Sequence, residues 1–367
     1  MEIEVLQDRL AKALSIVSRV AASTKSGLPI LSNVLIRAEG KQVSLTATNL
    51  ELATVEYVTA KVIKEGTITV PARLLNDFIS NLPKETIKMS VSGEKLTVSA
   101  GKYKSTINGI LADDYPELPT IDEEKAVAFK IPVDIFKESV NQVIIASSND
   151  MTRPALTGVF FNTSDGALYI AATDGYRLAD KKFVENVKSE IKAIVPTPAL
   201  REVLSSLSDD MEDIEVKIID TQIRFRMGEI EITSKLIDAS FPDYRQLIPH
   251  DIKSKVVLNK AELIRMTKVA ALFARESGGS VVCEAKKDEG SFSVSAVASE
   301  IGENTAAMET EVKTDGKVTL NSRYLLDAIN ATVDDEIEFD FSGKLAPVIV
   351  KNAKKDDYTH IIMPLKS

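Results

Sequence analysis

The 367-residue sequence is poor in the residues on which most catalytic and metal sites depend. It holds one cysteine, Cys283, no tryptophan, and two histidines, His250 and His360, which stand far apart. A single cysteine excludes an internal disulfide framework and is what we expect of a protein in a reducing cytosol. The scarcity of histidine leaves little scope for a histidine-based triad or for the usual zinc ligands.

Other absences narrow the class of protein further. No apolar run approaches the roughly 20 residues that cross a bilayer, and the first ten residues lack the basic and apolar regions of a signal peptide. Neither a GxGxxG nor a GxxxxGK[ST] loop occurs, so no phosphate-binding loop is recognisable. The net charge of -9 argues against a molecule whose whole surface is basic and attracts nucleic acid.

The sequence does contain an internal repeat with a period of roughly a third of its length. Apolar positions of a predicted helix recur at Leu10, Phe136 and Leu263. A strand that runs into a second, shorter helix recurs at Val70-Pro71-Ala72-Arg73, Val195-Pro196-Thr197-Pro198 and Leu320-Asn321-Ser322-Arg323. The repeat predicts three domains, over residues 1–120, 121–248 and 249–367.

Each third shows the same mixture of periodicities. Two segments have the 3.6-residue period of an amphipathic helix, and about eight segments alternate with the period of a strand. We therefore predict an α+β fold in which each domain packs two helices on antiparallel sheets. The predicted helices are Asp8–Ala21, Ala72–Leu82, Val133–Ala146, Pro198–Leu207, Lys260–Arg275 and Ser322–Ala331.

Charge is distributed unevenly between the predicted helices and the rest of the chain. The six helices sum to +4, so the remaining segments carry -13. In the segment from Lys260 to Arg275 the apolar residues share one face, and Arg265 and Lys268 lie on the other. A basic helical surface on an otherwise acidic protein can meet phosphates although the mean charge is negative.

Clusters of acidic residues suggest an alternative, because two-metal nucleases bind their ions with carboxylates. The clusters are Asp113-Asp114, Asp209-Asp210, Asp334-Asp335-Glu336 and Asp356-Asp357. Each lies in a predicted turn, where aspartate favours hydrogen bonds to the local backbone. We therefore expect no metal site. A metal-dependent enzyme, and an α+β scaffold that never touches DNA, remain as alternatives.

Six short motifs along the whole chain resemble those of the bacterial sliding clamps, the β subunits of DNA polymerase III. They are Leu28-Pro29-Ile30-Leu31, Val70-Pro71-Ala72-Arg73, Thr173-Asp174-Gly175-Tyr176-Arg177-Leu178, Ser234-Lys235-Leu236, Phe241-Pro242-Asp243-Tyr244-Arg245 and Met363-Pro364-Leu365-Lys366. The resemblance implies three clamp domains per chain and a head-to-tail homodimer. Such a six-domain ring encircles duplex DNA without regard to sequence, has no cofactor and catalyses no reaction.

The resemblance also implies which residues face DNA and which join the two copies. The DNA-facing candidates are Lys12, Arg19, Lys25, Arg73, Arg153, Arg201, Arg265, Lys268, Arg275 and Arg323. The interface candidates are Leu74 and Ile107 in the first domain and Leu272 and Phe273 in the third, although the last two could equally belong to the core.

Members of the family bind short apolar peptide motifs of the replicative polymerase, the clamp loader, repair polymerases and mismatch-repair or ligase proteins. The resemblance places this pocket at Leu156, Thr173, Gly175, Tyr176, Arg177, Leu178, Pro242, Leu247, Pro347, Ile362, Met363, Pro364, Leu365 and Lys366. Tyr176 and Lys366 depart from the residues that many relatives carry, and Ser367 ends the chain with a polar group. We expect these differences to affect partner preference, and we expect the protein to be cytoplasmic, at the nucleoid.

Overall fold

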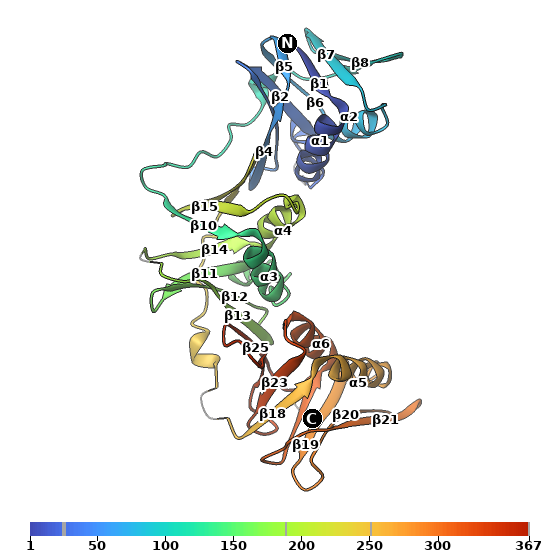
Figure 1. Cartoon of the computed structure of the whole chain (residues 1–367), viewed down its shortest axis with the longest axis vertical. Coiled ribbons are helices and arrows are strands. Elements are labelled where there is room, and N and C mark those ends of the chain that lie inside the picture. The colour runs from blue at the N-terminus through green and yellow to red at the C-terminus, as the bar shows by residue number, and fades with distance from the viewer. Residues whose placement is uncertain (24–26, 188, 250–251, 366–367) are drawn as a thin grey trace. The chain divides into compact units, whose positions relative to one another are not determined.

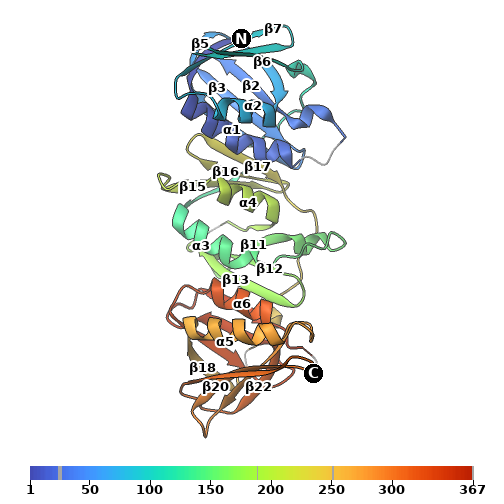
Figure 2. The same ribbon diagram turned by 90° about the vertical axis from the view of Figure 1, so that its right-hand side faces the viewer.

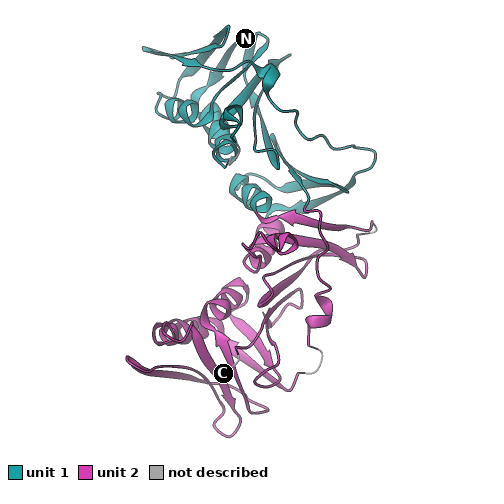
Figure 3. Cartoon of the chain, turned by 180° about the vertical axis from the view of Figure 1, so that it is seen from behind, with its two compact units in different colours: residues 1–133, 198–236 teal, residues 134–197, 237–367 magenta. Residues whose placement is uncertain are grey.

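The computed structural model describes residues 1–23, 27–187, 189–249 and 252–365. It forms two compact units, one of residues 1–133 with 198–236 and one of residues 134–197 with 237–367 (Figure 3). The middle third of the sequence is thus divided between the two units. Four residues named in the sequence analysis, Lys25, His250, Lys366 and Ser367, lie outside the described residues.

The described residues contain six α-helices, close to the predicted positions (Figure 1). Because α5 ends at Phe273, Arg275 lies beyond it and the helices carry a net charge of +3. No helix in these residues is long and apolar enough to cross a membrane. The helices are α1 (Gln7–Ala22), α2 (Ala72–Ser80), α3 (Val133–Ile144), α4 (Thr197–Ser206), α5 (Lys260–Phe273) and α6 (Ser322–Ala331).

The first unit contains two antiparallel sheets. In one, the strand order is β5 (Lys61–Lys64), β1 (Glu2–Leu6), β7 (Thr86–Ser92), β8 (Lys95–Ala100) and β9 (Tyr103–Asn108). In the other, it is β10 (Val127–Pro132), β15 (Asp213–Ile219), β16 (Gln222–Met227), β17 (Ile230–Lys235), β4 (Leu52–Thr59), β3 (Gln42–Thr48), β2 (Asn33–Glu39) and β6 (Gly66–Pro71). Helices α1 and α2 lie side by side over β2, β3 and β4 (Figure 2).

The second unit also contains two antiparallel sheets. One has the order β14 (Lys192–Pro196), β11 (Gly158–Ser164), β12 (Ala167–Thr173), β13 (Arg177–Val184), β25 (Tyr358–Ile362), β24 (Val348–Asn352), β23 (Glu336–Phe341) and β18 (Ser254–Asn259). The other has the order β21 (Gly302–Glu309), β20 (Ser291–Ala298), β19 (Ser280–Lys286) and β22 (Gly316–Asn321). Helices α5 and α6 pack against each other, and α5 covers β20 and β21.

The sheets show how the repeats are joined. Each eight-stranded sheet combines four strands of one third of the sequence with four strands of the next. In the first unit β17 pairs with β4, with Ile230 opposite Glu56; in the second, β25 pairs with β13, with Tyr358 opposite Lys181. The strand registers at the two joints match residue for residue, so the two joints are equivalent.

The helices form where the sequence supplies an apolar face and a start signal. Leu263, Met266 and Ala270 are buried on α5, whereas Arg265 and Lys268 are exposed, which confirms the predicted amphipathic face. The side chain of Asn321 caps α6 by accepting hydrogen bonds from the backbone N–H groups of residues 323 and 324.

Gly158 is confined by its neighbours in the sheet that joins β11 to β14. A methyl group at this position would lie 2.6 Å from Cγ2 of Ile194 and 2.7 Å from the carbonyl oxygen of Val195. We expect Gly158→Ala to lower the free energy of unfolding by about 1–3 kcal/mol, because an overpacked site must shift its surroundings. Gly27, around which no atom lies within 4 Å of such a methyl group, provides the control. Equal denaturation midpoints for both alanine variants would contradict the close packing.

Candidate functional site

The motif Thr173-Asp174-Gly175-Tyr176-Arg177-Leu178 forms the turn between β12 and β13. The hydroxyl of Thr173 donates to the carbonyl of Arg177 at 2.6 Å and accepts from the N–H of Gly175 at 3.0 Å. One carboxylate oxygen of Asp174 accepts from the N–H groups of Tyr176, at 2.9 Å, and Arg177, at 3.0 Å. Gly175 has a φ of +91°, a left-handed conformation that other residues adopt only with strain. The motif therefore fixes the direction in which residues 176–178 leave the turn.

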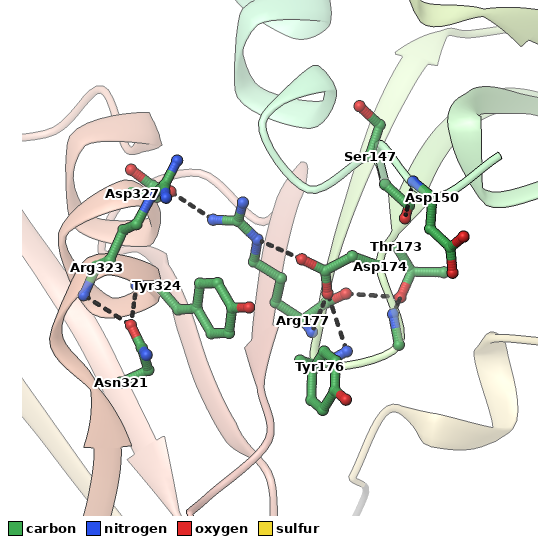
Figure 4. A network of polar contacts seen from close by, with 12 residues as sticks. Ser147, Asp150, Thr173, Asp174, Tyr176, Arg177, Asn321, Arg323, Tyr324 and Asp327 are labelled. Atoms are coloured by element: carbon green, nitrogen blue, oxygen red, sulfur yellow. Dashed lines mark hydrogen bonds and ion pairs between the residues drawn. The ribbon is translucent and has the colours of Figure 1, made fainter. Parts of the chain in front are cut away.

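Arg177 connects this turn to helix α6 (Figure 4). Its side chain is only 8 % exposed, and Nε donates to Asp174 at 3.1 Å while Nη1 donates to Asp327. The guanidinium lies 4.5 Å from the centre of the Tyr324 ring, a distance typical of a cation–π contact. Arg177 is thus a positioning residue that joins the turn of the second repeat to a helix of the third.

The last strand brings the end of the chain to the same place. The pairing of β13 with β25 sets Arg177 opposite Ile362 and Leu178 opposite Ile361, and the N–H of Met363 donates to the carbonyl of Tyr176 at 2.8 Å. Ile362 in turn pairs with Val348, the residue that follows Pro347. The strand pairing therefore brings together six of the residues that the resemblance singled out. They are Tyr176, Arg177, Leu178, Pro347, Ile362 and Met363.

The same region exposes apolar side chains above a buried layer. Tyr176, Leu247 and Met363 are 61 %, 54 % and 41 % exposed, whereas Leu178 and Ile362 are buried. Of the other predicted residues, Leu156 and Thr173 are buried, Pro347, Pro364 and Leu365 are half-buried, and Pro242 is exposed. Exposed apolar groups over a packed layer are able to contact an apolar ligand.

Residues 241–248 are held against the sheet by aromatic contacts. The ring of Phe241 stacks on Phe160 with 4.7 Å between centroids, and Tyr244 meets Phe160 edge-on. The hydroxyl of Tyr244 donates to Asp180 at 2.6 Å. Burial raises the pKa of Asp180, while the bond from Tyr244 counteracts that rise. These contacts hold the segment that carries Pro242 and Leu247, through Phe160 and Asp180, which the sequence does not single out.

A second polar network lies between the second and third repeats. The ammonium of Lys181, which is 3 % exposed, lies 2.9 Å from Glu138 and 2.9 Å from Asp357. The hydroxyl of Tyr358 is 2.8 Å from Nδ1 of His360. Burial lowers the pKa of His360 to about 3, so its ring is neutral near pH 7 and is not poised for acid–base chemistry.

The predicted DNA-facing residues fall into two groups. Most are exposed: Lys12, Arg73, Arg201, Arg265, Lys268, Arg275 and Arg323. Arg19 instead binds Glu202 of α4 at 2.7 Å and the hydroxyl of Ser206 at 2.8 Å. Arg153 lies just before the short 3-10 helix Pro154–Thr157, and its Nε is 2.9 Å from Asp150. Arg19 is thus half-buried in contacts with α4, whereas Arg153 is exposed like the first group and forms a surface ion pair.

The predicted interface residues also differ from one another. Leu74 on α2 and Leu272 on α5 are more than half exposed, as surface contacts require. Ile107 is buried in β9, and Phe273 packs against the core of the second unit. Leu74 and Leu272 are therefore accessible at the surface, whereas Ile107 and Phe273 pack within the protein.

The acidic clusters do not converge on a metal site. Within the described ranges, no three His, Cys, Asp or Glu side chains are grouped so that they could hold a metal ion. Asp334 instead accepts the N–H of Lys354, and Asp210 binds the hydroxyl of Ser208. Neither is the predicted hydrogen bond to the local backbone, because Lys354 is 20 residues from Asp334 and Asp210 bonds to a side chain.

Comparison with known proteins supplies the family context. Three family models match: the N-terminal, central and C-terminal domains of the DNA polymerase III beta subunit, at residues 1–119, 130–243 and 245–366. The beta sliding clamp of Staphylococcus aureus strain COL is 30% identical over 360 residues, covering 95% of this chain and 94% of that one. The Bacillus subtilis beta sliding clamp is 28% identical over the whole of both chains.

Solved structures agree with these matches. The DNA polymerase sliding clamp of Bacillus subtilis superposes with a TM-score of 0.95 at 28% identity, covering 100% of this chain and 99% of that one. A Pseudomonas aeruginosa DNA polymerase III subunit beta bound to griselimycin superposes with a TM-score of 0.94 at 28% identity, over 100% of both chains.

The bond between Arg177 and Asp327 gives a test of this site. We expect Asp327→Asn to lower the free energy of unfolding by about 2 kcal/mol, because the acceptor of a buried guanidinium loses its negative charge. Asp77→Asn provides the control, since Asp77 lies 3.9 Å from Arg73 in an exposed pair on α2 and should contribute less than about 0.5 kcal/mol. Chemical denaturation measures both, and equal effects would show that Arg177 does not depend on Asp327.

Proposed function

Because the chain belongs to the family of bacterial DNA polymerase III beta subunits, the sliding clamps, we propose that two copies close into a ring around duplex DNA. The family is a non-catalytic processivity factor of DNA replication, and this protein is accordingly a clamp and not an enzyme. A ring holds DNA by topology, so it can slide along any sequence. The alternatives of a metal-dependent enzyme and of a scaffold without DNA are set aside on the family membership.

The unpaired edges of the sheets are the observation that supports the dimer best. The last strand of each repeat, β9, β17 or β25, has one edge that pairs with no strand of the same repeat. The same is true of β4 in the first repeat, β13 in the second and β21 in the third. Two joints use these edges, β17 with β4 and β25 with β13. The strands left over are β9 of the first repeat and β21 of the third. A second copy would pair with both in the same way, which gives a head-to-tail dimer with two identical joints.

The equivalence of the repeats also specifies a register for this joint. Ile230 lies opposite Glu56 at one joint, and Tyr358 lies opposite Lys181 at the other. At the proposed joint between copies, the equivalent pair is Tyr103 of one copy and Ala306 of the other. Ser105 then lies opposite Asn304. The charges suit this arrangement, because Lys102 and Lys104 flank the start of β9 while Glu303 and Glu309 belong to β21. Leu74 and Leu272 are exposed on the adjoining helices.

We propose that the basic side chains of the helices meet the DNA phosphates. Lys12, Arg265, Lys268, Arg73, Arg201 and Arg323 belong to helices and are exposed, and Arg275 follows α5 directly. Contacts of this kind depend on charge and carry no sequence information, as sliding requires. Arg19 and Arg153 would first have to leave their carboxylate partners, so we expect them to contribute less.

We further propose that the surface around Tyr176, Leu247 and Met363 is the site that binds partner proteins. An apolar peptide segment would cover these exposed side chains, while the bonds of Arg177 keep the β12–β13 turn in place. The proposed partners are the replicative polymerase, the clamp loader, and repair polymerases, mismatch-repair and ligase proteins that carry short apolar motifs. Anchoring apolar groups would provide most of the affinity.

The domain boundaries and the location of the protein are part of the same proposal. Domains at residues 1–120, 121–248 and 249–367 are supported by the three family matches, which begin and end near these limits. A clamp of the replication machinery would act in the bacterial cytoplasm, at the nucleoid.

Cysteine cross-linking tests the proposed register. In a Cys283→Ala background, we expect Ser105→Cys with Asn304→Cys to form a disulfide between copies under mild oxidation, since residues opposite each other in a ladder are close enough. Ser105→Cys with Thr305→Cys is the control, because a slip of one residue turns the side chains to opposite faces. Dimer bands of equal yield from both pairs on a non-reducing gel would contradict the register.

Retention on DNA tests the topological mechanism. We expect a clamp placed by its loader to stay on nicked circular DNA, and to leave once a restriction enzyme linearises the circle. Blocking both ends of the linear DNA with bound protein should restore retention. Equal retention on the circle and on the open linear form, measured by gel filtration, would refute encirclement.

A further inference from the structure

A cavity of about 540 Å³ in the first unit is not needed for the proposed clamp function, although Lys12, one of the proposed DNA-facing residues, lies on its wall. It is bounded by α1, β4, the β16–β17 hairpin and the segment of residues 210–213, which all belong to one unit. Among the charged residues of its lining, five carboxylates outnumber the two basic side chains of Arg9 and Lys12. The five carboxylates are those of Glu56, Asp210, Glu212, Asp213 and Glu229.

Glu56 gives this cavity an unused hydrogen-bond acceptor. Its side chain belongs to a residue that is only 8 % exposed, and its buried Oε2 accepts no hydrogen bond within the described chain. Burial raises the pKa of Glu56 to about 7, although Lys12 and Arg19 act from a distance to lower it. A buried carboxylate without a donor is costly, so a ligand that supplies one would be stabilised here.

In the second unit, a side chain of the protein itself fills the place that corresponds to this cavity. Lys181 occupies the position in β13 that Glu56 occupies in β4, because each lies opposite the first residue of the joining strand. The Lys181 ammonium bonds to Glu138 and Asp357, both at 2.9 Å. The residues equivalent to these two in the first unit are Lys12 and Glu229. The first unit therefore lacks the buried ammonium that the second unit carries on its own chain.

We propose that this cavity binds the ammonium group of a small organic amine, and that a linear alkyl diamine is the class of ligand it fits. Oε2 of Glu56 accepts a hydrogen bond from one ammonium, in the place that Lys181 fills in the other unit. The carboxylates of Asp210, Asp213 and Glu229 attract the second ammonium. An organic cation suits the site better than a metal ion, because the described residues offer no group of three metal ligands.

Lys12 is the competing occupant of this place. It is equivalent to Glu138, and its charge acts on Glu56. Its side chain is exposed, however, and no hydrogen bond or ion pair to Glu56 is formed in the structure. The diamine and the Lys12 ammonium can be distinguished, because removal of Lys12 would open the site only if Lys12 fills it.

Methyl NMR of the full-length protein with 1,4-diaminobutane tests the proposal. Met211 and Ile230 line the cavity, so their methyl signals should shift and saturate at concentrations on the order of millimolar. The signals of Ile361 and Met363, which lie in the other unit, should not move. Neutral butane-1,4-diol should leave all four unchanged, because it carries no charge.

Two isosteric variants separate this site from general attraction to an acidic protein. Glu56→Gln should weaken binding at least about tenfold, because a charged acceptor becomes neutral. Asp340→Asn is the matched control: Asp340 is 1 % exposed and burial also raises its pKa, but it lies outside the cavity. It should bind the diamine as the unaltered protein does.

The pH dependence provides an independent readout. Since the pKa of Glu56 is about 7, its carboxyl is mostly neutral at pH 6 and mostly ionised at pH 8. The other charged groups that line the cavity are Arg9 and Lys12 of α1, Glu229 of the hairpin, and Asp210, Glu212 and Asp213. The charge of Arg19 of α1 also acts on Glu56. Binding should therefore be about tenfold weaker at pH 6 than at pH 8, and Glu56→Gln should remove most of this difference.

Three results would overturn the proposal. One is the absence of any saturable shift at Met211 and Ile230. Another is equal binding by the Glu56→Gln variant, which would mean nonspecific attraction to carboxylates. The third is binding that appears only in Lys12→Met, which would identify Lys12 as the occupant of the cavity.

Discussion

The hydrogen-bonding edge of a β-strand is the feature on which the rest of this structure depends. A strand at the edge of a sheet leaves a row of N–H and C=O groups that must find partners or remain in water. Here β17 joins β4, and β25 joins β13, so two eight-stranded sheets extend across the limits of the repeats. The compact units consequently do not coincide with the thirds of the sequence. The edges of β9 and β21 are the places where the same joint can form once more.

This backbone joint leaves the side chains at each junction free to differ. At one structurally equivalent position the three repeats carry Glu56, Lys181 and Ala306. The lysine bonds to two carboxylates, the glutamate faces a cavity with Oε2 unbonded, and the alanine has no polar side chain. Because main-chain hydrogen bonds hold the joint, these positions can acquire separate roles. Charge is also distributed unevenly, because the helices sum to a positive charge although the net charge of the chain is -9.

Much of the fold could be predicted from the sequence because its signals are local. The period of the apolar residues placed the helices to within a few residues, and Leu10, Phe136 and Leu263 are indeed buried. The end of α5 was predicted two residues too late, since nothing local to Arg275 marks the last turn.

The arrangement around Arg177 could be predicted only in part. Family resemblance connected the motif containing Asp174 and Gly175 with the end of the chain. Asp327, which is 150 residues away from Arg177, carries no signal of its own. The pairing of Arg19 with Glu202 is invisible for the same reason, because contacts between distant segments depend on the packed fold.

Hydrogen exchange of the backbone amides of β9 and β21 tests the central claim most directly. At concentrations where the mass in solution is twice 40.0 kDa, these amides should be protected to a degree comparable with those of β4 and β17, which are paired within the chain. Dilution to the monomer should release β9 and β21 while β4 and β17 stay protected. Rapid exchange of β9 and β21 in the intact dimer would contradict a ring closed by a third strand joint.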